Sequence, residues 1–189
     1  SFDYRSFLRR RTDDPWSQSK LVFFDLLHDN PEEALEVFET LSRNDAFDME
    51  EYLDYGDFLE CLFLLAEEFE KRGEYVKSFR FLKRIYLCEM ERPFFHYYIE
   101  EIMDRLMHIV GVKINKHLPA TESIPCIREL IDTGLPRKQT AELYKKLSEQ
   151  YFHMGQRLVA IQFLEKGLFL HKKLQGVKKL KAMIGYPEE

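Results

Sequence analysis

Apolar and small residues recur at helical spacing along most of the chain. In the first half, four of them follow the i, i+3, i+4, i+7 pattern that places side chains on one face of a helix: Leu62, Leu65, Ala66 and Phe69. After Gly73 a second stripe follows: Ser78, Leu82 and Ile85. Pro93 ends this stripe, because proline cannot continue a helix. The pattern predicts two helices joined by a tight turn at residues 71–74.

The same pattern returns in the second half of the chain. Its first stripe is Tyr144, Leu147, Ser148 and Tyr151, and its second stripe is Ala160, Leu164 and Gly167. Gly155 separates the stripes and Gly176 follows the second, as expected where helices end. The second helix of each pair contains small residues that allow two helices to approach closely: Ser78, Ala160 and Gly167.

A weaker copy lies near the start of the chain. Residues 17–28 have the spacing of a helix, and the next helix is predicted to begin at Asn30-Pro31. Asn30 is a favoured N-cap residue, Pro31 suits the first turn, and Glu33 can complete a capping box. The stripe that follows is Ala34, Phe38 and Leu41.

The middle of the chain is less regular. We expect one helix from Phe94 to Val110, ended by Gly111, and another over residues 121–133, stopped by Gly134. Residues 112–120 are predicted to link them. A last, basic helix is expected over residues 177–184. No run alternates apolar and polar residues as a strand does, so we predict no strand.

The helix pair at residues 62–86 resembles a tetratricopeptide repeat. The residues that carry the resemblance are Leu62, Leu65, Ala66, Phe69, Gly73, Tyr75, Ser78, Leu82 and Ile85, of which Ile85 departs from the small residue usual there. The pair at residues 144–167 matches at Tyr144, Leu147, Ser148, Tyr151, Gly155, Ala160, Leu164 and Gly167, with Arg157 in place of an aromatic. The pair at residues 17–41 matches mainly in its second helix.

The resemblance implies an all-α fold, a right-handed superhelix of stacked helical hairpins. We expect one domain over residues 1–189. Its parts would be hairpins at about 17–42, 57–92, 94–133 and 137–175, with a capping helix at 177–184. One hairpin cannot bury its apolar face alone, so stacking of neighbours would supply the core.

The resemblance also implies a concave groove lined by the first helix of each hairpin. The residues at groove-facing positions are Phe63, Glu67, Glu70 and Lys71 in the first half, and Glu142, Lys145, Glu149, Phe152 and His153 in the second. Such a groove would suit an amphipathic helix or an extended segment carrying basic residues. We therefore expect a protein–protein interaction module, an adaptor or scaffold, or an assembly or sensor domain of a larger protein.

Charge is distributed unevenly along the chain. The net charge is −5, made up of −9 over residues 1–92 and +4 over residues 93–189. This asymmetry can steer a partner or orient self-association. The hydrophobic runs are too short to span a bilayer, and the three widely spaced cysteines fit a reducing compartment, so we expect a cytoplasmic location.

No catalytic or metal-binding motif stands out. The six histidines form no HExxH or i, i+4 pair, and the acidic run at residues 45–60 lacks the order of a calcium loop. Glycines are few and lie at predicted turns, which leaves no phosphate-binding loop. We expect no enzymatic activity, cofactor or metal.

Two aromatic features and two other functions remain open at this point. Phe94, Phe95, Tyr97 and Tyr98 cannot all face one core stripe, so some must face a neighbouring hairpin, a groove or a partner, and packing between hairpins is favoured. Trp16 could pin the first helix or anchor a partner, and we expect it in the core. The alternative functions are a chaperone-like binder of secreted or membrane-complex subunits and a nucleic-acid-associated regulatory module. The latter would use the lysine-rich C-terminal end, although the acidic composition disfavours it.

Overall fold

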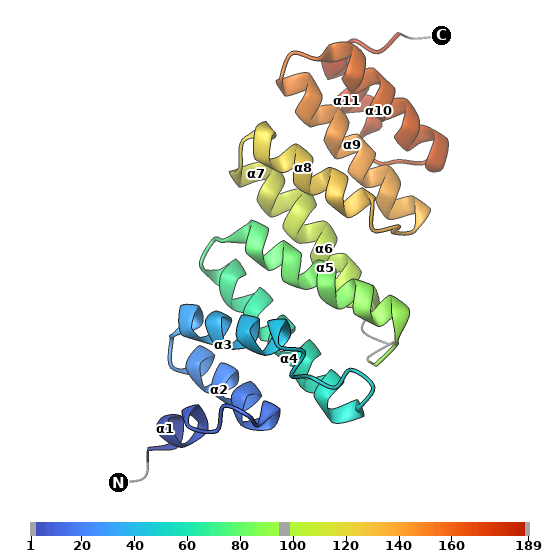
Figure 1. Cartoon of the computed structure of the whole chain (residues 1–189). Helices are drawn as coiled ribbons and strands as arrows, with labels where there is room; N and C mark the ends of the chain where they lie inside the picture. Colours follow the sequence, from blue (N-terminus) through green and yellow to red (C-terminus); the bar gives the residue numbers. More distant parts are fainter. Residues whose placement is uncertain (1–2, 95–98, 188–189) are drawn as a thin grey trace. The chain divides into compact units, whose positions relative to one another are not determined.

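A computed structural model describes residues 3–94 and 99–187 of the chain (Figure 1). The described residues form helices and short connections with no strand, which confirms the all-α prediction. The chain divides into two compact units, residues 1–99 and residues 100–189. Each unit has its own packed helices, and each is described by itself below.

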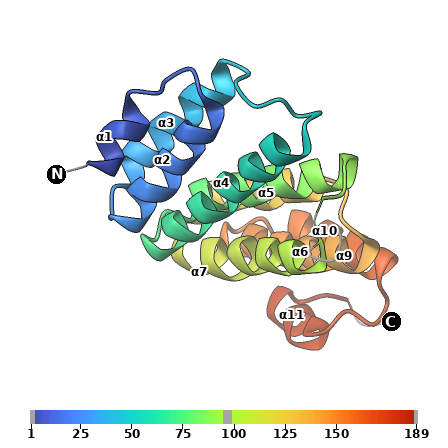
Figure 2. The same cartoon turned by 90° about the horizontal axis from the view of Figure 1, so that it is seen from below.

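The described residues of the first unit, 3–94, form five α-helices. They are α1 (Tyr4–Arg9), α2 (Pro15–Leu27), α3 (Pro31–Arg43), α4 (Tyr52–Lys71) and α5 (Tyr75–Glu91). Helix α2 packs against α1, α3 and α4, and α4 packs along α5 (Figures 1 and 2). Phe47, in the connection between α3 and α4, is buried against the rings of Phe38 and Phe58, with centroid distances of 6.3 and 5.4 Å. This contact fixes the long connection to the core.

The second unit begins with one long helical stretch. Helix α6 (Ile99–His108) continues through a π-helical segment (Ile109–Ile114) into α7 (Asn115–His117). The expectation that Gly111 ends a helix, followed by a linker over residues 112–120, is therefore wrong. Gly111 lies buried between Val110 and Ile114, which are also buried, so packing of this apolar run keeps the chain helical.

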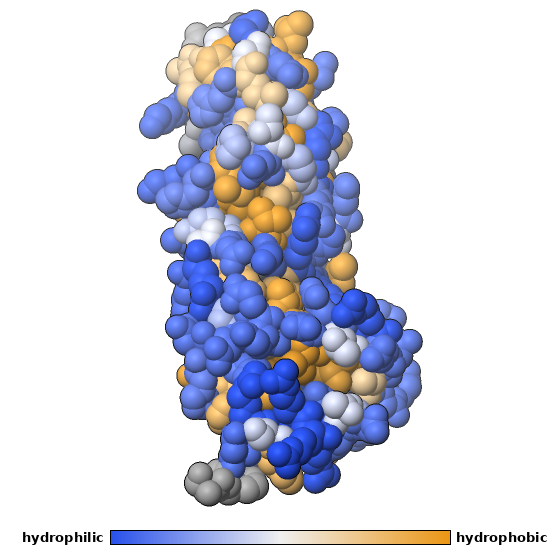
Figure 3. All heavy atoms as spheres, turned by 60° about the vertical axis from the view of Figure 1, so that its left-hand side comes forward, coloured by the Kyte–Doolittle hydropathy of each residue, from blue (hydrophilic) through white to orange (hydrophobic). Residues whose placement is uncertain are grey.

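Four further helices complete the second unit. They are α8 (Ala120–Ile131), α9 (Arg137–His153), α10 (Arg157–Leu170) and α11 (Val177–Ile184). Helices α9 and α10 pack along each other, and α11 packs against both of them (Figures 1 and 2). Their shared core includes Ala160, Leu164, Leu180 and Ile184. Hydrophobic residues also show as patches between hydrophilic residues on one face of the molecule (Figure 3).

The turns of the α4–α5 and α9–α10 pairs have the same geometry. Gly73 and Gly155 have φ values of +75° and +77°, in the left-handed region that glycine adopts without strain. In each turn the next residue donates its backbone N–H to a carbonyl five positions back, Glu74 to Phe69 and Gln156 to Tyr151, both at 2.9 Å. This bonding is that of a helix C-terminus closed by glycine.

The helix that begins at Pro31 is capped differently from the prediction. Asn30 occupies the N-cap position, but its side chain makes no capping hydrogen bond. Its backbone N–H instead bonds to the Asp25 carbonyl at 2.8 Å, which closes the turn from α2. Glu33 lies near Arg5 and raises the pKa of that guanidinium, together with the nearer Asp25.

Of the aromatic cluster at residues 94–98, only Phe94 is described; Phe95, Tyr97 and Tyr98 lie outside the described residues. The Phe94 ring packs on Tyr52 and Tyr55, at centroid distances of 4.5 and 5.5 Å. The Tyr55 hydroxyl donates to the carbonyls of Cys88 and Arg92 at 3.0 and 2.8 Å. These contacts hold the end of α5 against the start of α4.

A serine and an alanine meet where the helices of each matching pair come closest. In the α4–α5 pair, the Ser78 hydroxyl of α5 donates to the Ala66 carbonyl of α4 at 2.7 Å. In the α9–α10 pair the residues are exchanged, and Ser148 of α9 donates to the Ala160 carbonyl of α10 at 2.6 Å. All four side chains are fully buried. Each site therefore has room for one hydroxyl, on either helix.

This exchange predicts a coupled pair of substitutions in the first unit. Ser78→Ala should cost about 1 kcal/mol of unfolding free energy through the lost hydrogen bond. Ala66→Ser alone should cost about 1–3 kcal/mol by crowding the site. The double variant reproduces the arrangement of the α9–α10 pair, so it should be less destabilised than the sum of the single variants. Urea unfolding of all four proteins measures this coupling, and additive effects would contradict it.

Candidate functional site

An exposed stripe of large side chains runs along α2. Its members are spaced at i, i+4, i+7 and i+11: Trp16, Lys20, Phe23 and Leu27. Trp16 is 52% exposed and Leu27 is 84% exposed, while Lys20 and Phe23 are half-buried. The prediction that Trp16 lies in the core is therefore wrong. The opposite face of α2 already supplies the core contacts through Leu21 and Val22.

The side chains of this stripe are ordered by contacts with one another. The Lys20 Nζ lies 5.8 Å from the centroid of the Trp16 ring and 4.9 Å from that of Phe23. An ammonium over ring faces is attracted by the electron density of the rings. The lysine thus holds both aromatic side chains in place while their outer surfaces stay open to solvent.

Helix α2 is fixed by buried polar groups on its other side. The Asp25 carboxylate is fully buried and accepts from the Arg5 guanidinium at 2.7 and 3.3 Å. The Gln18 amide donates to the carbonyls of Leu8 and Arg11 at 3.0 and 2.9 Å. These bonds tie α2 to α1 and its following loop, so the exposed stripe stands on a rigid element.

Helix α4 runs beside α2 in the same direction. Near the start of both helices, Lys20 interacts electrostatically with Asp57 and Cys61. At their ends, the Arg72 guanidinium pairs with Asp29 at 2.6 Å and with Glu68 at 3.0 Å. The start of α2 therefore interacts with the start of α4, and the residues that follow the two helices interact with each other. The two helices run parallel.

The exposed side of α4 is acidic and partly apolar, and Asp57 connects it with the α2 stripe through Lys20. Asp57 is half-buried, and burial raises the pKa of its carboxyl although Lys20 opposes the shift. Glu60 and Glu67 follow on the solvent side, and Leu53 is 70% exposed. We call the α2 stripe together with these four residues of α4 the α2–α4 face.

The groove residues predicted in the first half lie on α4. Glu67 belongs to the α2–α4 face, Lys71 is exposed at the end of the helix, and Phe63 and Glu70 are half-buried. The sequence analysis missed the α2 stripe itself. The helical spacing of the stripe was present in the sequence and could have revealed it. When the first helix pair is aligned with the second so that Ala34 matches Ser78, Phe23 falls at the position of Glu67, which was predicted to face the groove.

The groove residues predicted in the second half lie on α9. Lys145 is buried, and its ammonium donates to the Gln175 carbonyl at 2.8 Å and pairs with Glu142 at 3.0 Å. The lysine therefore anchors the connection between α10 and α11. Glu149 lies 3.9 Å from Lys146, Phe152 packs against the core around α11, and His153 is exposed at the helix end.

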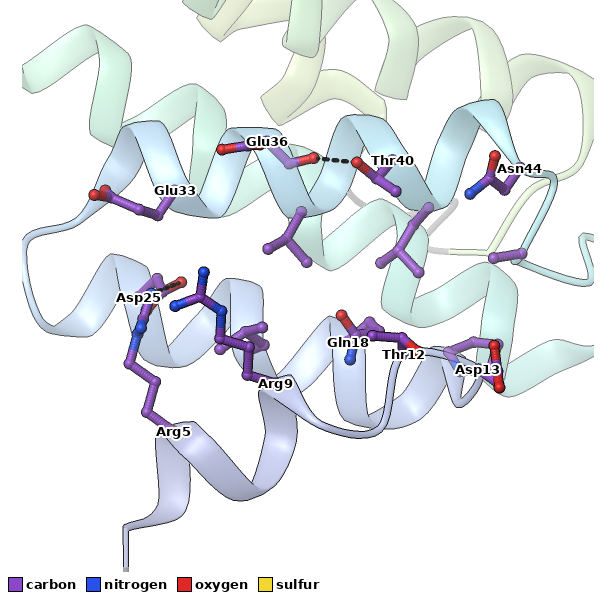
Figure 4. A pocket seen from close by; sticks show the side chains of 15 residues that line it. Arg5, Arg9, Thr12, Asp13, Gln18, Asp25, Glu33, Glu36, Thr40 and Asn44 are labelled. Carbon is purple, nitrogen blue, oxygen red and sulfur yellow. Dashed lines mark hydrogen bonds and ion pairs between the residues drawn. The ribbon is translucent and has the colours of Figure 1, made fainter.

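A cavity of about 580 Å³ lies on the other side of α2, between α1 and α3 (Figure 4). Arg5 and Arg9 reach it from α1, and Glu33 and Glu36 line it from α3. The buried Arg5–Asp25 pair lies in its wall. The lining carries both charges without a cluster of groups that act on one atom, so it indicates no specific chemistry.

The thiols of Cys61 and Cys88 in the first unit are affected by burial. Burial raises the pKa of the Cys61 and Cys88 thiols, which disfavours the reactive thiolate. Among the described residues, no three His, Cys, Asp or Glu side chains gather as a metal site would require. The described helices also include none with the length and apolar character needed to cross a membrane.

The raised pKa of Asp57 predicts a pH-dependent effect of one substitution. A carboxyl whose pKa is raised by folding stabilises the fold while it is protonated, and this contribution is lost as the pH rises through its folded pKa. Asp57→Asn should therefore match the parent protein near about pH 3 and melt at a higher temperature than the parent near about pH 7. Thermal unfolding at both pH values measures the difference. The matched control is Glu60→Gln, an exposed acid that should change the melting temperature little at either pH, and equal behaviour of both variants would contradict the prediction.

Comparison with known proteins adds no relative to these observations. No family model, no curated protein and no solved structure matches the chain.

Proposed function

We propose that the chain is a protein–protein interaction module whose α2–α4 face binds an amphipathic helix or an extended segment carrying basic residues. The observation that carries the proposal is the exposed α2 stripe, in which Trp16 and Leu27 face solvent beside acidic residues of α4. Tryptophan is among the residues that contribute most to protein interfaces when they become covered. No catalytic group is needed for this role.

The charges around the stripe favour a basic partner. Asp57, Glu60 and Glu67 follow one side of the face, while Lys20 is already held over the rings of Trp16 and Phe23. A partner's arginine or lysine would find carboxylates beside an apolar surface for its leucines or aromatics. Asp57 already interacts with Lys20, so the exposed Glu60 and Glu67 are the carboxylates most open to a partner's cation.

The resemblance to tetratricopeptide repeats extends this proposal to the fold. In that arrangement, α2 and α4 would be first helices of neighbouring hairpins, and their exposed faces would line the concave side of a superhelix. The parallel course of α2 and α4, set by Lys20 and Arg72, fits such stacking. The adaptor or scaffold role rests on this analogy with the family.

The only tryptophan of the chain lies on this face, so its fluorescence can test the proposal. A peptide of leucines and arginines that forms an amphipathic helix should shift Trp16 emission to shorter wavelength as it covers the ring. The same peptide with glutamates in place of arginines should bind about tenfold more weakly or not at all.

Substitutions that remove apolar or acidic side chains from the α2–α4 face should weaken peptide binding. The Leu27→Ser variant and the double variant Glu60→Gln/Glu67→Gln should each lower the affinity for the basic peptide about fivefold or more. Glu39→Gln, an exposed acid on α3, is the matched control and should leave the affinity unchanged. Equal binding of both peptides, or equal loss in the control, would refute the proposal.

The two alternative functions give different results in the same titrations. A chaperone-like binder would hold unfolded apolar clients regardless of their charge. A nucleic-acid module would bind single-stranded oligonucleotides, and its affinity for them would fall steeply as the salt concentration rises. The exposed lysines that could contact phosphates include Lys172, Lys173, Lys178 and Lys179.

A further inference from the structure

Three aromatic rings of α9 and α10 stack in the second unit, where Phe163 is buried and Tyr144 and Tyr151 are half-buried. The Phe163 ring of α10 lies between two rings of α9, with its centroid 5.9 Å from Tyr144 and 5.2 Å from Tyr151. The interplanar angles are 19° and 9°, so the rings are nearly parallel. The stack forms a continuous apolar layer along the α9–α10 pair.

Two cations rest on this stack. The Arg128 guanidinium of α8 lies 5.5 and 5.1 Å from the ring centroids of Tyr151 and Phe163, and donates twice to the Tyr151 hydroxyl at 3.1 and 2.6 Å. The Lys166 ammonium lies 5.8 Å from the Tyr144 centroid and 5.1 Å from that of Phe163. Both cations are exposed, and neither pairs with a carboxylate among residues 3–94 and 99–187.

The stack separates two adjoining hollows that share Tyr144 and Lys166. The smaller, of about 170 Å³, is lined by both cations and by Asp132. The larger, of about 610 Å³, is lined on its apolar side by Phe169 and Leu170. Phe169 is 79% exposed. A hollow lined by two cations thus adjoins a mainly apolar one, whose lining also includes Glu165 and Lys166.

We propose that this aromatic–basic shelf, made of Arg128, Tyr144, Phe163, Lys166 and Phe169, binds a partner protein segment in which an aspartate or glutamate precedes an aromatic residue or leucine. The carboxylate occupies the smaller hollow between the Arg128 and Lys166 charges. The apolar side chain fills the larger hollow against Tyr144 and Phe169.

Charge and preorganisation both favour this partner. Residues 100–189 carry 15 Lys and Arg against 11 Asp and Glu, a net charge of +4 that attracts acidic segments. The ring contacts and the Tyr151 hydroxyl already hold the guanidinium in place, so binding a carboxylate loses little side-chain freedom. The shelf takes the opposite charge from the α2–α4 face and lies in the other unit, so it is a second and separate docking surface.

Fluorescence anisotropy with labelled peptides tests the shelf. The probe is a peptide containing the run Asp-Phe-Leu-Asp between glycine and serine residues, and the matched probe has asparagine in place of both aspartates. The acidic probe should bind at least about fivefold more tightly than the neutral one at low salt, and this preference should fall as salt is added. Equal binding of the two probes would overturn the proposal.

Variants locate the binding and separate it from a purely structural role of the cations. Arg128→Gln and Lys166→Gln should each lower the affinity for the acidic probe about fivefold. Lys179→Gln, which replaces an exposed lysine of α11, should leave this affinity unchanged. Lys166→Glu should reverse the preference, so that a probe with lysines in place of the aspartates binds more tightly. If the glutamine variants change only the melting temperature, or if Lys166→Glu leaves the preference unchanged, the cations serve only the fold and the proposal fails.

Discussion

Close contact between paired helices is the constraint on which both units depend. At the points where α4 meets α5 and α9 meets α10, the side chains are one serine and one alanine, and the serine hydroxyl bonds to a backbone carbonyl of the facing helix. In the second pair Gly167 extends the contact, because a Cβ there would lie 3.1 Å from the Ala141 carbonyl oxygen. Larger residues at these positions would separate the helices and open the core.

This close packing determines which side chains are left for the surface. Once Leu62, Leu65 and Phe69 face α5, the other side of α4 is directed to α2 and to solvent. The same holds for α2, whose buried face is fixed by the Arg5–Asp25 pair and by Gln18. The exposed aromatic and acidic residues of the α2–α4 face are therefore not needed for the core, which is why they are available for a partner.

Both proposed surfaces combine aromatic rings with cations held over them. Lys20 lies over Trp16 and Phe23 in the first unit, while Arg128 and Lys166 lie over the stacked rings of the second. The surroundings give these clusters opposite preferences. In the first unit the neighbouring helix adds carboxylates, whereas in the second the two cations line one hollow with Asp132 and form no ion pair among the described residues. Neighbouring charge, not the ring–cation contact itself, decides which partner each surface favours.

The sequence alone determined the helices, because their signals are local. The i, i+3, i+4 stripes, the glycines at residues 73 and 155 and the basic helix at 177–184 all rest on interactions within a few residues, and the structure contains each of them. Local signals failed where packing opposed them. Gly111 is predicted to end a helix but lies within a helical segment among buried neighbours. The Asn30 side chain makes no capping hydrogen bond, while its backbone N–H closes the turn from α2.

Only the tertiary structure decided how individual side chains are used. A lysine at a repeat position indicates a groove residue in sequence, yet Lys145 is buried against a carbonyl 30 residues away. Trp16 is expected in the core, yet its side chain is 52% exposed while Leu21 and Val22 of the same helix are buried. Burial and ion pairing depend on residues that are distant in the chain, so no local pattern contains them. The helices could be predicted from the sequence for this reason, while the two proposed surfaces required the fold.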